Sequence, residues 1–291
     1  MMKKLLPLFA LLLFTGTQLH AQETIIVSDT LQGWDYSWLA GLNASQASYS
    51  NWAQGGVNNI SASGNSTLTM KHRKDKFGYG FLLGTRYGKS KIEGQGTRKT
   101  DDRLSIRNRF TYDLARANGS YSAYGNINFR TQFDKGYEYD AGPNDEDVLI
   151  SRFMAPAYFS QGAGIAYIPS DYFSAEAGLA LKQTIVTDDD LETLYGLDEG
   201  ETLRNEGGIT LGLGYDQAIA PNFQLSSSVE TFTNVNTAIS STDVYFSTQV
   251  TGKVNDLINT SLRVDLAYDD DFSSEIQVLQ VFSLGISFIL I

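Results

Sequence analysis

Hydrophobic and polar residues alternate along most of the chain beyond residue 33. In the first alternating segment Trp34, Tyr36 and Trp38 fall on one face, as a strand with one apolar face requires. Similar segments are centred on residues 60–70, 77–87, 104–114, 121–133, 157–167, 173–181, 209–215, 223–233, 244–254, 258–268 and 276–290. No comparable pattern of helical period appears. The alternation therefore predicts an all-β chain of about 12 strands.

The length of the segments and the polarity of their second face distinguish two architectures. A soluble sandwich packs its apolar face against a second sheet, whereas a membrane barrel turns that face to lipid and its polar face to the lumen. Several segments run for 10–13 residues, and tilted strands of about 9–11 residues are needed to cross the hydrocarbon. We expect a transmembrane barrel, with a soluble sandwich or lipocalin-like barrel as the alternative.

The connections between the segments alternate between short and long. Short turns are expected at residues 71–76, 115–119, 168–172, 219–222 and 254–257, and longer connections at 43–59, 88–102, 134–153, 184–205, 234–242 and 269–274. This alternation is typical of short periplasmic turns and longer extracellular loops. It predicts a closed, up-and-down, antiparallel transmembrane β-barrel with an even number of strands.

The first residues have the pattern of an export signal. Lys3 and Lys4 precede an apolar run at 5–14, and Leu19-His20-Ala21 offers a cleavage site before Gln22. We expect residues 1–21 to be a signal peptide, 22–32 a short periplasmic N-terminal tail and 33–291 a single barrel domain in the outer membrane of a Gram-negative bacterium. A retained N-terminal anchor is the alternative. Residues 22–27 also resemble the energy-coupling box of large transporters, whose barrels of ~22 strands this chain is too short to form.

Composition excludes several kinds of chemistry. The 291 residues contain no cysteine and carry a net charge of −11, so disulfides and thiolate chemistry are absent and binding of nucleic acid is not expected. We expect no cofactor and no metal. Acidic residues cluster in three of the longer connections. They are expected to be solvated charge, with cation-mediated contact to lipopolysaccharide as the alternative.

The polar faces of the strands carry ionisable side chains. If the barrel is closed, these residues line the lumen, where they set ion preference or pair with one another. The candidates for lumen charges are Arg107, Arg109, Arg130, Glu176, Lys182, Glu230, Arg263 and Asp265, with Glu206 beside them. A barrel of about 12 strands lies between filled barrels and open porins, so we expect a narrow or gated passage.

Five short motifs resemble an uncharacterised family of Bacteroidota outer-membrane barrels, known only as a domain of unknown function. They are Asn51-Trp52-Ala53-Gln54-Gly55-Gly56, Arg98-Lys99-Thr100-Asp101-Asp102, Thr131-Gln132-Phe133, Gly136-Tyr137 and Phe153-Met154-Ala155-Pro156-Ala157-Tyr158. The resemblance implies a barrel fold and an outer-membrane location, and no reaction.

The motifs lie at the expected outer ends of strands or in outer loops, where they can meet at the extracellular mouth. The candidates for a ligand-binding vestibule are Asn51, Trp52, Gly55, Gly56, Arg98, Lys99, Asp101, Asp102, Gln132 and Tyr137. Trp52 would offer a flat apolar face, and the polar groups would orient a ligand. The alternative, which we favour, is that these residues fold the loops inward through tight turns and paired charges.

An enzyme is not expected. Barrel phospholipases and omptin-like proteases need a catalytic histidine, and after signal cleavage only His72 remains, in an expected inner turn. Carboxylate-pair hydrolysis is left open.

The expected partners are outer-membrane lipid, lipopolysaccharide and the barrel-assembly machinery, which would read the apolar final strand with Phe288 near its end. The sequence predicts a narrow passive channel or uptake pore for small polar solutes. A non-conducting surface barrel that binds a partner or lipopolysaccharide through acidic loops is the alternative.

Overall fold

The computed structural model describes residues 25–48, 57–115, 121–236, 242–255, 258–269 and 273–289. Twelve strands close into a barrel: β1 (Gly33–Ala47), β2 (Asn59–Lys74), β3 (Phe77–Ile92), β4 (Gly96–Ala115), β5 (Tyr121–Thr131), β8 (Ala157–Ser170), β9 (Phe173–Ile185), β10 (Leu203–Ala220), β11 (Phe223–Asn234), β12 (Thr242–Lys253), β13 (Ile258–Asp269) and β14 (Ser273–Ile289). The prediction of an all-β barrel with about 12 strands is confirmed.

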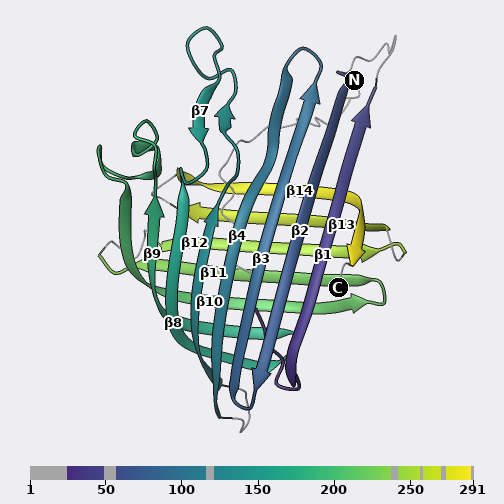
Figure 1. Cartoon of the computed structure of the whole chain (residues 1–291), viewed down its shortest axis with the longest axis vertical. Helices are drawn as coiled ribbons and strands as arrows, with labels where there is room; N and C mark the ends of the chain where they lie inside the picture. Colours follow the sequence, from purple (N-terminus) through teal and green to yellow (C-terminus); the bar gives the residue numbers. More distant parts are fainter. Residues whose placement is uncertain are drawn as a thin grey trace, which may run out of the picture.

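The barrel is an antiparallel meander in which each strand pairs with its neighbours in sequence (Figure 1). Between β5 and β8 the chain leaves the wall to form a separate hairpin of β6 (Gly136–Glu138) and β7 (Val148–Ser151). The ring closes where β1 pairs with β14, through Leu39–Leu42 and Ile286–Ile289. This closing seam contains four described residue pairs, whereas β1 and β2 share 15.

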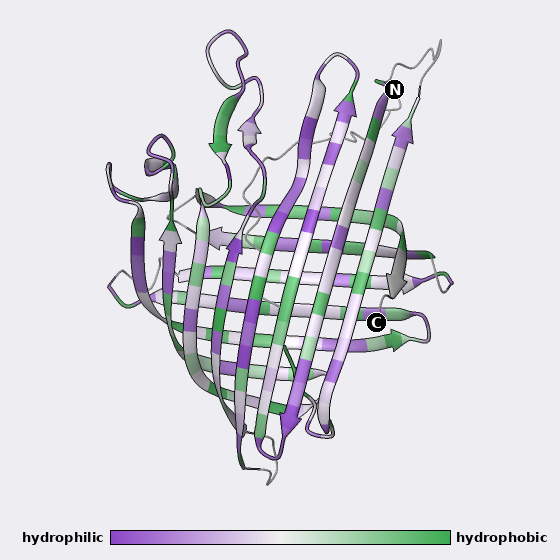
Figure 2. Ribbon diagram, in the orientation of Figure 1, coloured by the Kyte–Doolittle hydropathy of each residue, from purple (hydrophilic) through white to green (hydrophobic). Residues whose placement is uncertain are grey.

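The apolar face of the wall points outward and the charged face inward. Leu211 and Phe282 are 55% and 74% exposed, while Arg109 and Asp265 are each 4% exposed. Figure 2 shows the same alternation of hydrophobic and hydrophilic residues along the strands. An outer apolar surface with buried charges is the reverse of a soluble sandwich and is what a lipid-facing barrel requires.

Aromatic side chains gather on the outer face near the short-turn end. Trp34 stacks on Tyr36 with ring centroids 5.6 Å apart, and Tyr121 and Tyr167 lie 5.0 Å apart. Such rings form a girdle where a bilayer meets water. His72 belongs to this girdle, because it lies 4.6 Å from Trp34 within β2, rather than in a turn as expected.

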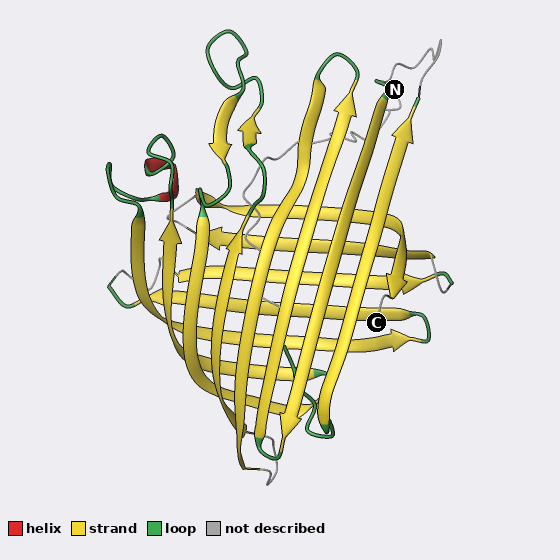
Figure 3. Ribbon diagram, viewed as in Figure 1, coloured by secondary structure: helices red, strands yellow, loops and turns green. Residues whose placement is uncertain are grey.

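The longer connections are more ordered than the sequence predicts. Residues 88–102 were expected to be a loop, but β3 continues to Ile92 and β4 begins at Gly96, so the two strands form a hairpin that rises beyond the other strands (Figure 1). The ladder continues because backbone pairing does not need an apolar face once the strands leave the lipid. A 3-10 helix, η1 (Thr193–Tyr195), lies in the connection after β9 (Figure 3). Among the described residues no helix is long and apolar enough to span a membrane.

The outward orientation of the apolar face predicts the effect of a charge on it. Leu211 lies at the middle of β10, and we expect Leu211→Arg to lower the free energy of unfolding in lipid vesicles by about 2–4 kcal/mol. Denaturant titration measures this loss. Leu194→Arg is the control, because Leu194 is exposed in η1. Equal unfolding midpoints for the two variants would show that Leu211 does not face lipid.

Candidate functional site

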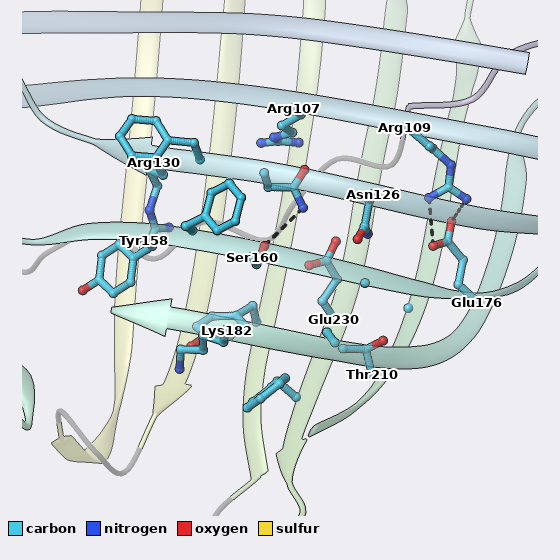
Figure 4. A pocket seen from close by; sticks show the side chains of 18 of the residues that line it. Arg107, Arg109, Asn126, Arg130, Tyr158, Ser160, Glu176, Lys182, Thr210 and Glu230 are labelled. Carbon is cyan, nitrogen blue, oxygen red and sulfur yellow. Dashed lines mark hydrogen bonds and ion pairs between the residues drawn. The ribbon is translucent and has the colours of Figure 1, made fainter. Parts of the chain in front are cut away.

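An ion pair between β4 and β9 crosses the inner surface of the barrel. Arg109 donates to Glu176 through both terminal nitrogens, at 3.1 and 2.6 Å, and its guanidinium lies 4.6 Å from the ring centre of Tyr124 (Figure 4). Both charged side chains are at most one-tenth exposed. A bidentate pair of this kind fixes both side chains and neutralises their charge.

A second group of paired charges joins β9, β10 and β12. The ammonium of Lys182 donates to Asp243 at 2.9 Å and lies 3.9 Å from a carboxylate oxygen of Glu206. Arg204 forms an ion pair with the same Glu206 at 3.2 Å. These contacts occupy the inner wall near the long-connection end, where they limit the open width of the lumen.

Two cavities lie inside the barrel. The first cavity, of about 180 Å³, is lined by residues of the β4, β5, β8, β9 and β10 walls (Figure 4). The second cavity, of about 450 Å³, extends toward the short-turn end, where Asp171 and Asp216 line it. Arg103, Ser105 and Arg107 of β4 line both cavities. The interior is therefore neither filled throughout nor open as a wide pore.

The segment before β1 lies inside the barrel. Ile25 and Val27 are 7% and 8% exposed and lie over Gly78 and Gly80, two inward positions of β3. A Cβ atom on Gly80 would lie 2.5 Å from Cγ2 of Ile25, so only glycine leaves room for the segment. Ile25 lines the first cavity and the next residue lines the second, so this N-terminal segment borders both.

The position of this segment differs from the sequence expectation. Residues 22–32 were expected to be a tail on the periplasmic side, but the described part, from Ile25, runs back behind the wall from the base of β1 (Figure 3). The signal in the sequence was the spacing of Gly78 and Gly80 at successive inward positions of one strand, which leaves a groove in an otherwise filled wall.

The eight predicted lumen charges lie on the inner face of the wall. Seven of them line one or both cavities: Arg107, Arg109, Arg130, Glu176, Lys182, Glu230 and Arg263. The eighth, Asp265, is buried, pairs with Arg263 at 3.2 Å and accepts a hydrogen bond from Ser247 at 2.6 Å. Sequence reasoning missed Arg86 and Arg103, because it assigned the neighbouring residues 88–102 to a loop.

The vestibule candidates are only partly described. Asn51, Trp52, Gly55 and Gly56 lie outside the described residues. The others come together near the long-connection end, which is the juxtaposition that the sequence predicts, and whether they bind a ligand there stays a prediction.

The described vestibule candidates hold the connection after β5 in place. Asp102 accepts hydrogen bonds from the backbone amides of Phe133 and Asp134, each at 2.8 Å, and its carboxylate lies 2.9 Å from the ammonium of Lys99. Lys99 also donates to the carbonyl of Asp134 at 2.8 Å. The Asp102 side chain is 3% exposed. A buried carboxylate with three donors serves as a fixed anchor for the loop.

The remaining vestibule candidates also bond within the protein. Arg98 donates to Asp140 at 2.7 Å, and Asp101 forms an ion pair with Arg86 at 3.4 Å. In separate contacts, the amide of Gln132 donates to the carbonyls of Arg152 and Ala155, and Tyr137 lies 6.3 Å from Tyr139. These contacts match the alternative that we favoured, in which the loops fold inward through paired charges.

The two largest outer connections share a small apolar core. Ala155, Val186, Leu191, Tyr195 and Leu197 are at most 5% exposed. The hydroxyl of Tyr195 donates to the carbonyl of Ile150 at 2.6 Å, and burial raises the pKa of this phenol.

Asp134, at the edge of these connections, accepts a hydrogen bond from Tyr87 at 2.6 Å. This bond is the main cause that lowers the pKa of Asp134 to about 2, with Lys89 nearby also contributing. The carboxylate is therefore ionised at neutral pH and remains a fixed negative group at the mouth of the barrel.

The described residues contain no group of three or more His, Asp or Glu side chains placed to hold a metal ion.

The fold and its charged interior define the class of protein: a transmembrane β-barrel with 12 strands and a polar lumen. A family model described as "Protein of unknown function (DUF3078)" matches residues 44–137. The match confirms the resemblance to a family of unknown function over this stretch, and the motif at 153–158 lies beyond it. No curated protein matches the sequence.

Solved barrels with similar folds share little sequence with this chain. The translocator domain of the autotransporter NalP from Neisseria meningitidis is 13% identical over 89% of each chain, with a TM-score of 0.41. An outer-membrane channel from Pseudomonas putida F1 is 11% identical over 91% of this chain and 99% of that chain, also with a TM-score of 0.41. The Pseudomonas putida toluene transporter TodX is 10% identical over 88% and 84%, with a TM-score of 0.34. Likeness at this level does not indicate what this chain conducts or binds.

The position of the N-terminal segment can be tested with a disulfide, since the chain has no native cysteine. A Cβ on Gly80 would lie 3.3 Å from the Cβ of Ile25, close to the ~3.5–4.5 Å of disulfides. We expect the double variant Ile25→Cys with Gly80→Cys to cross-link on oxidation, as detected by mass spectrometry of peptides. In the control, Ile25→Cys with Gly84→Cys, the second cysteine lies about 13 Å further along β3. Equal cross-linking in both would place the segment elsewhere.

The anchoring role of Asp102 predicts a local loss of order. Asp102→Asn removes the charge that pairs with Lys99 and one of the acceptors for the loop amides, at a cost of about 1–3 kcal/mol. We expect trypsin to cleave the folded barrel faster at Lys135, as followed by mass spectrometry. Asp145→Asn is the control, because Asp145 is exposed in the same connection. An unchanged cleavage rate in Asp102→Asn would contradict the anchoring role.

Proposed function

We propose that this chain resides in the outer membrane of a Gram-negative bacterium and acts as a narrow passive channel for small polar solutes. The observation that carries the proposal is the pair of polar cavities inside a belt of lipid-facing side chains, which share lining residues on β4. A non-conducting barrel of this size gains nothing from unfilled polar space, because voids forfeit packing contacts. Adjoining cavities that share Arg103, Ser105 and Arg107 instead offer successive positions for a hydrated solute.

The interior limits what can pass. The Arg109–Glu176 pair, the contacts of Lys182 and the N-terminal segment occupy space that the lumen of a wide porin leaves to water. The second cavity, of about 450 Å³, is within the range of small-molecule sites. The proposal is therefore for solutes of one or two small rings at most, rather than for general diffusion.

A second candidate is a non-conducting surface barrel that binds a partner or lipopolysaccharide. The observation that favours it is the ordered long-connection end, where the β6–β7 hairpin and the loop core around Tyr195 are built from specific contacts. Exposed acidic residues of the same connections, among them Glu138, Asp145 and Glu146, would provide its binding surface, with divalent cations bridging to anionic lipid. The further expectation that the chain is not an enzyme stays a prediction.

Conductance separates these candidates. We expect the refolded barrel to produce single-channel steps in a planar bilayer, because water and ions can enter the two cavities. Removing residues 22–28 should raise the step size, since Ile25 and Ile26 line the passage. The control is the Leu194→Arg variant, which alters an exposed loop residue outside the lumen. A well-folded barrel that stays silent, with and without residues 22–28, would support the surface-binding candidate instead.

A further inference from the structure

We propose that the lumen contains a binding site for small solutes that carry a carboxylate, sulfate or phosphate group. The site consists of Arg86, Arg103, Arg107, Arg130 and Arg263, which we call the arginine band. This inference rests on the proposed channel function and names the chemical class of its solute.

The arginine band occupies the place where the two cavities meet. Arg103 is the central member, because the other four arginines are its charged neighbours. Arg103 and Arg107 line both cavities, Arg130 lines the first, and Arg86 and Arg263 line the second. A solute that moves from one cavity to the other therefore passes these side chains.

The band places like charges against each other. Arg86 of β3 and Arg103 of β4 are directly opposite in the ladder, on the inner face. Like charges at opposed positions destabilise a sheet, and in the interior of a barrel less water is present to screen them. An arrangement that costs stability needs a compensating interaction, and a bound anion between the two guanidinium groups would provide it.

Arg103 differs from the other cations of the lumen. Arg109 and Lys182 each have a carboxylate partner within 3.1 Å, and Arg86 lies 3.4 Å from a carboxylate oxygen of Asp101. Within the described part of the chain, Arg103 forms no ion pair, and its buried Nε atom has no hydrogen-bond partner. Buried polar groups without partners are rare in native proteins and commonly mark a missing ligand.

The balance of charge around the cavities also favours an anion. Although the whole chain carries a net charge of −11, basic side chains outnumber acidic ones in the cavity walls. The basic residues are Lys71, Arg86, Arg103, Arg107, Arg109, Arg130, Lys182 and Arg263, and the acidic ones are Asp171, Glu176, Asp216, Glu230 and Asp243. Two of these acidic residues, Glu176 and Asp243, are already paired with Arg109 and Lys182.

The chemistry of arginine narrows the ligand class. The planar guanidinium donates two parallel hydrogen bonds to the two oxygens of a carboxylate, sulfate or phosphate, which a halide cannot accept in the same way. Arg130 adds a rigid element, because its guanidinium lies 4.5 Å from the ring centre of Tyr158 (Figure 4). The ring also offers an apolar face next to the band for the carbon skeleton of an organic anion.

Ion selectivity and block of the current test the site. In a planar bilayer with a KCl gradient, we expect a reversal potential of the sign for anion preference. Inorganic phosphate and glucuronate should each reduce the chloride current, while glucose at the same concentration should not. Separate additions of phosphate and glucuronate show whether the band prefers a phosphate or a carboxylate group.

Three variants distinguish the arginine band from a general effect of charge. Arg103→Gln should weaken the block by about tenfold or more, the loss expected for a hydrogen bond to a charged group. Arg103→Lys keeps the charge and should retain anion preference with a weaker block, because lysine lacks the two-pronged geometry. Lys74→Gln removes the same charge from the exposed end of β2 and should leave both measurements unchanged.

The possible failures can be told apart. A channel that conducts without anion preference, and without block by phosphate or glucuronate, would overturn the arginine band and leave the channel function standing. A silent barrel would overturn the channel function. The site would then be tested by equilibrium dialysis of labelled phosphate against the refolded protein in detergent: binding that Arg103→Gln weakens supports it, and no binding overturns it.

Discussion

A peptide group inside a bilayer has no water with which to bond, and this constraint shapes the molecule. Each amide and carbonyl of a strand that crosses the hydrocarbon must pair with a neighbouring strand, so the sheet has to close on itself. The 12-strand ring meets this condition through antiparallel neighbours along nearly the whole chain. The side-chain alternation follows from it, because a closed wall has one face toward lipid and one toward the lumen.

Closure also creates the problem of what to place inside. A ring of this size encloses more space than the side chains of its own wall fill, and the protein uses three means to occupy it. Charged pairs such as Arg109–Glu176 cross the inner surface, the N-terminal segment lies over Gly78 and Gly80, and the remaining polar volume forms the two cavities. The first two restrict the passage, and the third gives the lumen its capacity to hold a solute.

The alternation in the sequence was enough to predict the fold, because lipid-facing positions such as Leu211 and Leu213 must be apolar whatever the rest of the chain does. It could not predict where strands end beyond the membrane. Between Ile92 and Gly96 the hairpin continues with charged residues on both faces, which a pattern search takes for a loop. The loop anchor at Asp102 and the packing of Ile25 on Gly80 are contacts between distant segments, and single-sequence patterns carry no information about such pairs.

The seam between β1 and β14 has a mechanical consequence. With four described residue pairs, it holds the two ends of the sheet together by far fewer backbone bonds than any other joint beside β1. Local opening of a protein begins where the fewest bonds must break. Thermal motion or lateral tension in the surrounding lipid would therefore part the ring first along Leu39–Leu42, while the remaining eleven joints stayed intact. The same joint must form last during membrane insertion, since it alone links strands from opposite ends of the chain.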